Sequence, residues 1–289
     1  MNRSAFAGGT LAASLVPLAA RAGDVDSQIA SAAAESTGEV GVFARKMGPG
    51  VPIAYNANVV FPAASTIKVL ILVSLYQAAE KSPGLLESTV RLQSSDFVGG
   101  SDVLQNANPG DRIRVSTLAN AMIDQSDNTA SNALITLLGF DRINATAQRA
   151  GLKNTQLKRH FLDYTAIVHH SNNLTTAHDM GTLLYLIERG SREAVYTVAS
   201  PQSCRAMIQI MLKQEDRDKI ARGLPKGIPL ANKTGEIDGV RNDVAIVDPF
   251  GDNPYVLAVY TKDLNDFSVG VIAIRNIAHS VHATLNPQN

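Results

Sequence analysis

Tryptophan is absent from this sequence, cysteine occurs once, and aromatic residues make up only 5% of the 289 positions. A single cysteine, Cys204, excludes an internal disulfide bond and any metal site built from several cysteines. We expect Cys204 to be a small buried apolar residue, because it lies in a helical pattern. The shortage of aromatic side chains argues against the base-stacking surfaces that bind single-stranded nucleic acids.

Net charge is absent as well, since 26 Lys and Arg residues balance 26 Asp and Glu residues. A neutral chain has no electrostatic attraction for nucleic acid or for an anionic membrane surface. After the first 22 residues, no stretch reaches the roughly eighteen unbroken apolar residues of a membrane span. The hydrophobic content of 45% suits a sizeable core, in one large domain or two smaller ones. We therefore expect neither a nucleic-acid partner nor a membrane span.

Residues 1–22 have the pattern of a secretory signal peptide. Arg3 lies near the start, an uncharged stretch follows, and Ala20-Arg21-Ala22 has the small-x-small form cut by signal peptidase. The mature chain is predicted to begin at Gly23, with no cysteine there for a lipid anchor. We expect a soluble monomer that is periplasmic or secreted.

Strand-like runs occur at both ends of the chain. Two short runs near the N-terminus flank a Gly-Pro-Gly turn and predict a hairpin, but a hairpin alone is too small to be stable. Three further runs precede a C-terminal helix. We predict that these strands form one antiparallel five-stranded sheet flanked by the two terminal helices. The predicted strands are 40–45, 52–56, 229–233, 240–247 and 255–261, and the terminal helices are 24–35 and 267–285.

The pattern between these ends is helical. Six helices are expected, and the aperiodic stretch 152–173 is expected to be a long loop of functional importance. The fold class is therefore α/β (α+β), with an all-helical domain, 61–213, inserted between the halves of a discontinuous α/β domain, 23–60 and 214–289. The six helices are 65–81, 115–123, 129–138, 141–150, 175–188 and 201–213.

A nucleophile and an amine lie together at the start of the first inserted helix. Lys68 follows Ser65 by three positions, so both side chains project from one helical face. A serine hydroxyl needs a base to become a good nucleophile, and a lysine whose pKa is lowered by burial can act as that base. The apolar run 69–75 supplies the burial. Alone, however, Ser-x-x-Lys is a common chance pattern.

Two later tripeptides make chance improbable. Ser126-Asp127-Asn128 falls on a break between two predicted helices, and Lys233-Thr234-Gly235 ends a predicted strand. Each would be an ordinary surface turn in isolation, but the three motifs occur in the order Ser-x-x-Lys, Ser-Asp-Asn, Lys-Thr-Gly. With its motif flanks 61–68 and 122–132, the chain resembles the class A β-lactamases and their penicillin-recognising serine hydrolase relatives. The resemblance covers most of the predicted mature protein.

The resemblance implies a role for each motif residue. Ser65 would attack the lactam carbonyl and form an acyl-enzyme. Lys68, kept partly unprotonated by burial and by the second cation Lys233, would be the base, and Ser126 would relay a proton to the leaving nitrogen. No metal or other cofactor is implied, and the histidines near the loop match no metal motif.

Substrate contacts follow from the same resemblance. Asn128 would donate to the substrate's side-chain amide, and the N–H groups of Ser65 and Glu236 would form an oxyanion hole. Thr234, Lys233 and Arg241 would face the substrate carboxylate. Gly235 would let the strand approach the substrate closely. Arg241 has the alternative role of a surface strand residue.

One position departs from the family pattern. The family carries an arginine followed two residues later by a glutamate that activates the deacylating water, and here Arg159 is followed by Phe161. Asp163 is the nearest carboxylate and could take the role, or it could pair with Arg159 or cap a helix. The expected activity is β-lactam hydrolysis through Ser65. The alternatives are an esterase or D,D-peptidase/penicillin-binding protein with slow or no lactam turnover, and a non-catalytic binding protein.

Overall fold

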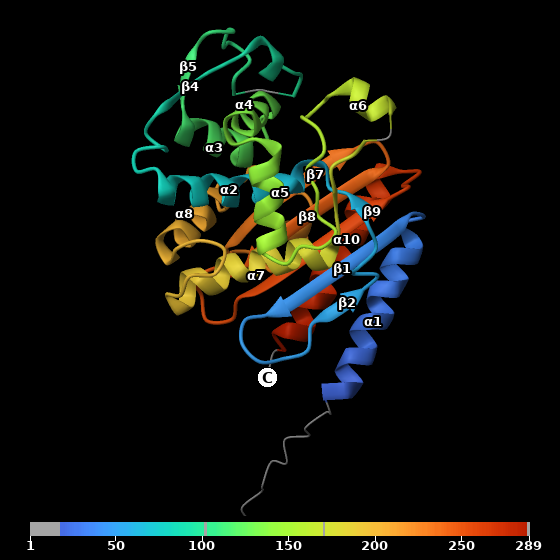
Figure 1. Ribbon diagram of the computed structural model, residues 1–289. Coiled ribbons are helices and arrows are strands. Elements are labelled where there is room, and N and C mark those ends of the chain that lie inside the picture. The colour runs from blue at the N-terminus through green and yellow to red at the C-terminus, as the bar shows by residue number, and fades with distance from the viewer. Residues whose placement is uncertain (1–17, 101–102, 170, 288–289) are drawn as a thin grey trace, which may run out of the picture.

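A computed structural model describes residues 18–100, 103–169 and 171–287. Its main sheet has the strand order β2-β1-β9-β8-β7, and every neighbouring pair is antiparallel. The five strands come from both ends of the chain (Figure 1), which confirms the predicted sheet. They are β1 (Glu39–Lys46), β2 (Ile53–Tyr55), β7 (Leu230–Ile237), β8 (Val240–Val247) and β9 (Tyr255–Lys262).

The two faces of this sheet are covered by different helices. Alternate side chains of a strand point to opposite faces. In β1, Val42 joins the core formed with α1 (Leu18–Glu35) and α10 (Phe267–Leu285). The adjacent Phe43 joins the core of the helical segments on the other face, where α7 (Ala177–Glu193) packs on the sheet. The predicted mixed fold with flanking terminal helices is confirmed.

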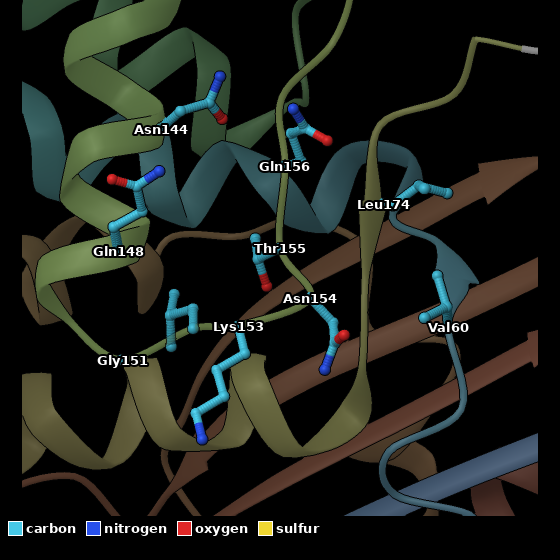
Figure 2. A pocket seen from close by; sticks show the side chains of 10 residues that line it. Val60, Asn144, Gln148, Gly151, Lys153, Asn154, Thr155, Gln156 and Leu174 are labelled. Carbon is cyan, nitrogen blue, oxygen red and sulfur yellow. The ribbon is translucent and has the colours of Figure 1, made fainter.

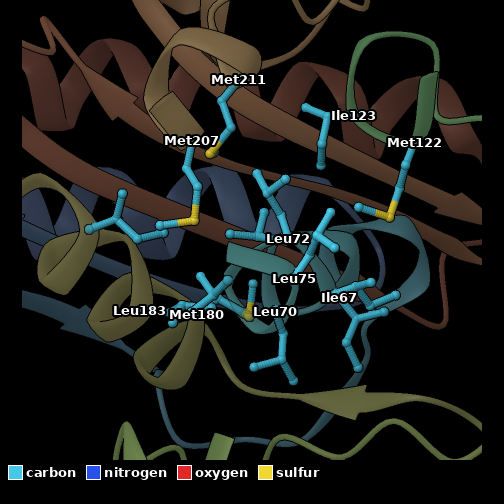
Figure 3. Packing of buried hydrophobic residues seen from close by; sticks show 14 of the residues in the cluster. Ile67, Leu70, Leu72, Leu75, Met122, Ile123, Met180, Leu183, Met207 and Met211 are labelled. Atoms are coloured by element: carbon cyan, nitrogen blue, oxygen red, sulfur yellow. The ribbon is translucent and has the colours of Figure 1, made fainter. Parts of the chain in front are cut away.

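Helix α2 (Lys68–Lys81) lies at the centre of the helical segments. Its residues from Lys68 to Tyr76 are all buried, which is typical of a helix enclosed on every side rather than of an amphipathic surface helix. Figure 3 shows Leu70, Leu72 and Leu75 surrounded by methionine and leucine side chains of neighbouring helices. This packing fixes the helix whose first turn carries the predicted nucleophile.

The remaining elements are mostly short. Helical elements are η1 (Ala64–Ile67), η2 (Ser94–Asp96), α3 (Val115–Asp124), α4 (Asn128–Leu138), α5 (Phe140–Arg149), α6 (Tyr164–Val168), α8 (Pro201–Met211) and α9 (Ile220–Gly223). Two small sheets pair β3 (Phe61–Pro62) with β6 (Leu174–Thr175), and β4 (Thr89–Arg91) with β5 (Arg112–Arg114). The sequence did not predict these sheets, because two or three residues carry no readable alternation.

Several local predictions need correction. The stretch 152–173, which the sequence predicts to be a long loop, contains the short helix α6. The Lys233-Thr234-Gly235 motif does not end its strand but lies inside β7, which continues to Ile237. Gly235 therefore marks a close approach of the backbone to η1 and not a turn. The first helix begins at Leu18 instead of residue 24. The first turn at Ser65 is a 3₁₀ turn, η1, rather than the start of the α-helix.

Residues 1–17 of the predicted signal peptide lie outside the described residues. In the part of the chain that is described, no helix combines the length and apolarity needed to cross a membrane.

Candidate active site

Ser65 lies in the 3₁₀ turn η1, where β3 leads into α2. The preceding Ala64 has a φ of +46°, a strained conformation for a residue with a side chain and one that concentrates at functional sites. The surrounding structure holds the turn in place. The Ala63 N–H donates to the Asn173 carbonyl at 2.8 Å, and Asn242 Nδ2 donates to the Pro62 carbonyl at 3.0 Å.

Lys68 begins α2, and its side chain is fully buried. Its Nζ donates to the Ser126 carbonyl at 2.7 Å, to Ser126 Oγ at 3.1 Å and to Asn128 Oδ1 at 2.9 Å. Burial lowers the pKa of Lys68 well below its usual value, the charge of Lys233 lowers it further, and Asp127 opposes the shift. The amine is therefore held in place and biased toward the unprotonated form that a general base needs.

Phe161 covers another side of this amine. Lys68 Nζ lies 4.3 Å from the centroid of the Phe161 ring, within the range of a cation–π contact. The backbone of Phe161 is fixed to α4, because its N–H donates to Asn132 Oδ1 at 2.8 Å and its carbonyl accepts from Asn132 Nδ2 at 3.3 Å. An apolar ring therefore lies beside Lys68 at the loop position where the family pattern has a glutamate.

Ser126 lies on the break between α3 and α4, as the sequence predicted. Its φ of +60° is left-handed, a conformation that turns the chain sharply between the two helices. Asp127 stabilises the start of α4, since its carboxylate accepts the N–H of Ala130 at 2.8 Å and that of Leu104 at 3.0 Å. Asn128 also donates to the Gly99 carbonyl at 3.0 Å. The break thus presents Ser126 and Asn128 together to Lys68.

Strand β7 passes close to η1 at Gly235. A Cβ atom at this position would lie 3.0 Å from Ser65 N and 3.1 Å from Ala63 O, closer than side chains ordinarily allow. Lys233 is fully buried, and its Nζ donates to the Thr234 carbonyl at 2.9 Å. Burial lowers the pKa of Lys233 to about 7, against the opposing charges of Asp243 and Asp216. This lysine is therefore only partly protonated at neutral pH.

These residues surround a cavity of about 410 Å³. Its walls come from η1, from the α3–α4 break, from β7 and from the segment that follows α8. A smaller hollow of about 70 Å³ extends from Ser65 toward Phe161 and Arg159. The predicted residues that line the main cavity are Ser65, Ser126, Asn128, Thr234, Gly235 and Glu236.

Arg241 is placed differently from the predicted carboxylate-binding role. It donates to the carbonyl oxygens of Ile237 and Val240 and lies 4.0 Å over the Phe267 ring. Its Nε lies 3.8 Å from Glu236 Oε1. Glu236 also pairs with Lys219, at 2.7 Å. Arg241 is not among the described residues that line either hollow.

Lys219 was not identified from the sequence, although it follows Asp216 by three positions on a highly charged run. Its side chain is only 1% exposed, and its Nζ lies 2.6 Å from Asp216 Oδ2 as well as 2.7 Å from Glu236. A charged run is usually read as a solvated surface. Only the fold, which buries this lysine against β7, reveals its position at the edge of the cavity.

Asp163 lies at the N-terminus of α6, where its Oδ1 accepts the N–H of Ala166 at 3.0 Å. This contact is the helix cap that the sequence left open as an alternative. The charge of Asp163 also acts on Arg159, whose pKa is lowered mainly by burial and raised in part by that carboxylate. Asp163 is not among the described residues that line the two hollows around Ser65.

Another cavity, of about 540 Å³, lies apart from these residues. Figure 2 shows polar side chains at its wall, including Asn144, Gln148 and Lys153. None of the predicted site residues lines it. Among the residues that the structure describes, no group of three or more His, Cys, Asp or Glu side chains could hold a metal ion.

The fold and the Ser-x-x-Lys turn beside the cavity of about 410 Å³ define the class of penicillin-recognising serine hydrolases. Comparison with known proteins agrees. The family model described as the beta-lactamase enzyme family matches residues 24–285, and the chain belongs to this family. The predicted relation to the class A β-lactamases is thereby confirmed.

The relatives cover most of the chain. Beta-lactamase CTX-M-25 from Escherichia coli is 30% identical over 250 residues, which are 85% of this chain and 83% of that protein. A solved structure of a beta-lactamase from Sphaerobacter thermophilus is 30% identical with a TM-score of 0.80, covering 92% of this chain and 98% of that one. The solved structure of PBP-A is 29% identical with a TM-score of 0.80, and the match covers 90% of this chain and 94% of PBP-A. A mutant of PBP-A is described as an acyl-enzyme complex with penicillin G.

Proposed function

We propose that this protein opens β-lactam rings by acyl transfer to Ser65. Lys68 takes the proton of the Ser65 hydroxyl as the hydroxyl attacks the lactam carbonyl. Ser126, at 3.1 Å from Lys68 Nζ, passes a proton to the ring nitrogen as the C–N bond breaks. The backbone N–H groups of Ser65 and Glu236 receive the developing negative charge on the carbonyl oxygen. Asn128 and Thr234 hold the substrate in the cavity.

The observation that carries the proposal is the contact set of Lys68. A fully buried amine whose Nζ reaches both Ser126 Oγ and Asn128 Oδ1 begins the helix directly after the turn that contains Ser65. Its lowered pKa comes from burial and from Lys233. A lysine with only a structural role would be expected to meet a carboxylate partner here. An amine surrounded by hydroxyl, amide and aromatic groups is suited to exchanging protons.

Ser65→Ala is expected to abolish covalent labelling by a fluorescent penicillin. Ser74→Ala is the matched control, because Ser74 is a buried serine on α2, the helix that directly follows the turn of Ser65, and its Oγ has no hydrogen-bond partner among the described residues. Its removal should leave labelling unchanged. Both variants are analysed by gel fluorescence and intact mass spectrometry after their folding is checked by circular dichroism. Undiminished labelling of the Ser65→Ala protein would refute the assignment of the nucleophile.

We infer further that hydrolysis of the acyl-enzyme is slow. The group against Lys68 is the ring of Phe161, which cannot take a proton from water, so one of the usual routes of deacylation is missing. The remaining turnover would depend on Asp163. This inference brings the protein close to the penicillin-binding alternative, in which the lactam acylates the serine quickly and leaves it slowly.

Asp163→Asn is expected to leave acylation rapid and to lengthen the life of the adduct. The substitution separates two roles, because asparagine caps a helix about as well as aspartate but cannot accept a proton from water. The rates are measured by stopped-flow labelling and by the loss of adduct mass over time. An unchanged adduct lifetime would leave Asp163 as a helix cap alone.

Three wider features belong to the same proposal. We propose that the chain acts as a monomer, is exported with residues 1–22 as its signal, and has no nucleic-acid partner. Zero net charge supports the last point.

A further inference from the structure

We propose that Glu236 is a specificity residue that fills the carboxylate subsite with its own carboxylate, so that the site favours acyl substrates without an anionic group at that position. The inference rests on the proposed acyl transfer at Ser65 and concerns the choice of substrate. It follows from three features of the cavity wall formed by β7.

The first feature is the position of Glu236. It directly follows the Lys-Thr-Gly motif on β7, lines the cavity, and also lines the smaller hollow beside Ser65. Its side chain is 48% exposed, so the carboxylate can be reached from the cavity. A substrate group that lies along β7 beyond Gly235 would meet this side chain.

The second feature is the pairing of the nearby cations. Glu236 Oε1 lies 2.7 Å from Lys219 Nζ and 3.8 Å from Arg241 Nε. Lys219 is further paired with Asp216 at 2.6 Å, and Arg241 is occupied by two backbone carbonyls and the Phe267 ring. The two negative charges, of Glu236 and Asp216, thus balance the two positive charges, of Lys219 and Arg241. A substrate carboxylate arriving here would have to displace Glu236 or lie beside a like charge.

The third feature is the reduced positive charge of Lys233. Lys233 is fully buried, and burial lowers its pKa to about 7, so it is only partly charged at neutral pH. It therefore offers a substrate carboxylate only part of a positive charge. Substrates such as esters, amides or lactams whose acid group is masked avoid this conflict.

The test compares penicillin G with its methyl ester in a Ser65→Ala background, where no covalent step can occur. Dissociation constants are measured by isothermal titration calorimetry on the mature chain. Glu236→Gln keeps the shape of the side chain and frees Lys219. It is expected to tighten binding of the acid by about tenfold, a typical size for one desolvated charge contact, and to change binding of the ester by less than about twofold.

Glu39→Gln is the matched control. Glu39 is exposed to a similar degree as Glu236 and makes an ion pair of similar length with Lys262, at 2.9 Å, and neither Glu39 nor Lys262 lines the described cavity. It removes the same formal charge, so an effect of net charge alone would appear equally in both variants. The control is expected to leave the acid-to-ester ratio of affinities unchanged.

Two outcomes overturn the proposal. One is an unchanged or weakened affinity of Glu236→Gln for the acid, and the other is an equal gain for acid and ester. Failure of the proposed function would appear elsewhere, as the absence of a covalent adduct on Ser65 in the unsubstituted protein. The equilibrium measurement does not depend on that adduct.

Discussion

Lys68 lies among groups that act on its proton affinity in opposite directions. Burial and Lys233 favour the neutral amine, and Asp127 favours the ammonium. The Phe161 ring adds no proton-accepting group. A neutral lysine can accept a hydrogen bond from Ser126 Oγ across the same 3.1 Å contact. The amine can therefore exchange a proton with Ser126 without leaving its position.

The pH dependence of acylation is expected to report the charge of Lys233. Because its folded pKa is about 7, Lys233 is charged below pH 7 and loses its charge as the pH rises through this value. Acylation by penicillin G should therefore fall above about pH 7, whereas acylation by its methyl ester, which has no carboxylate to attract, should show no such fall. Second-order acylation rates measured between pH 5 and 9 check this expectation. An identical alkaline limb for both compounds would contradict it.

For single residues, the order of the motifs made the polar residues of the site predictable. The contacts that these residues make with other parts of the chain could not be predicted. The order of the three motifs carries the resemblance to the class A β-lactamases, and that resemblance implies that Ser65, Ser126 and Lys233 converge. The contact between Phe161 and Lys68, and the burial of Lys219, depend on the path of two loops. Sequence periodicity carries no information about such paths.

Among the elements, β7 and η1 depend on each other. Gly235→Ala would place a Cβ atom 3.0 Å from Ser65 N and 3.1 Å from Ala63 O. Because the turn must shift by a few tenths of an ångström, acylation is expected to fall roughly ten- to a hundredfold, with a loss of stability of only about 1 kcal/mol. Labelling rates and thermal unfolding measure the two effects separately. A stable variant that acylates at the normal rate would show that this approach does not position Ser65.

The accuracy of the predicted element boundaries differed from one element to the next. Strand β8 and helix α10 begin and end at the predicted residues. Helix α7, in contrast, runs from Ala177 to Glu193 instead of from 175 to 188, and β7 continues to Ile237 instead of ending at 233. The two-residue pair β3 and β6 was missed, although it joins the segment before Ser65 to the segment before α7. Tertiary contacts create such bridges, and local sequence does not.

In the molecule as a whole, the site forms where the sheet meets the helical segments. We propose that the chain is divided into a discontinuous α/β domain, 23–60 with 214–289, and an inserted helical domain, 61–213. The two parts share one core, since Leu70 of α2 and Val244 of β8 belong to the same buried cluster. The sheet could be predicted because two short N-terminal strands required partners, and the C-terminal strands were available. The extent of the shared core could not be predicted, because it depends on how α7 packs against the sheet.

We propose that Ser65 is acylated quickly and released slowly because Phe161 lies against Lys68. Phe161→Glu would place a carboxylate near this amine, and Phe161→Leu would keep the position apolar. The most direct measurement is the lifetime of the penicillin G adduct on each protein, followed by intact mass spectrometry after free lactam is removed. We predict a persistent adduct on the unsubstituted and Phe161→Leu proteins, and loss of the adduct about a hundredfold faster on Phe161→Glu. An adduct that never forms, or one equally short-lived on all three proteins, would contradict the account.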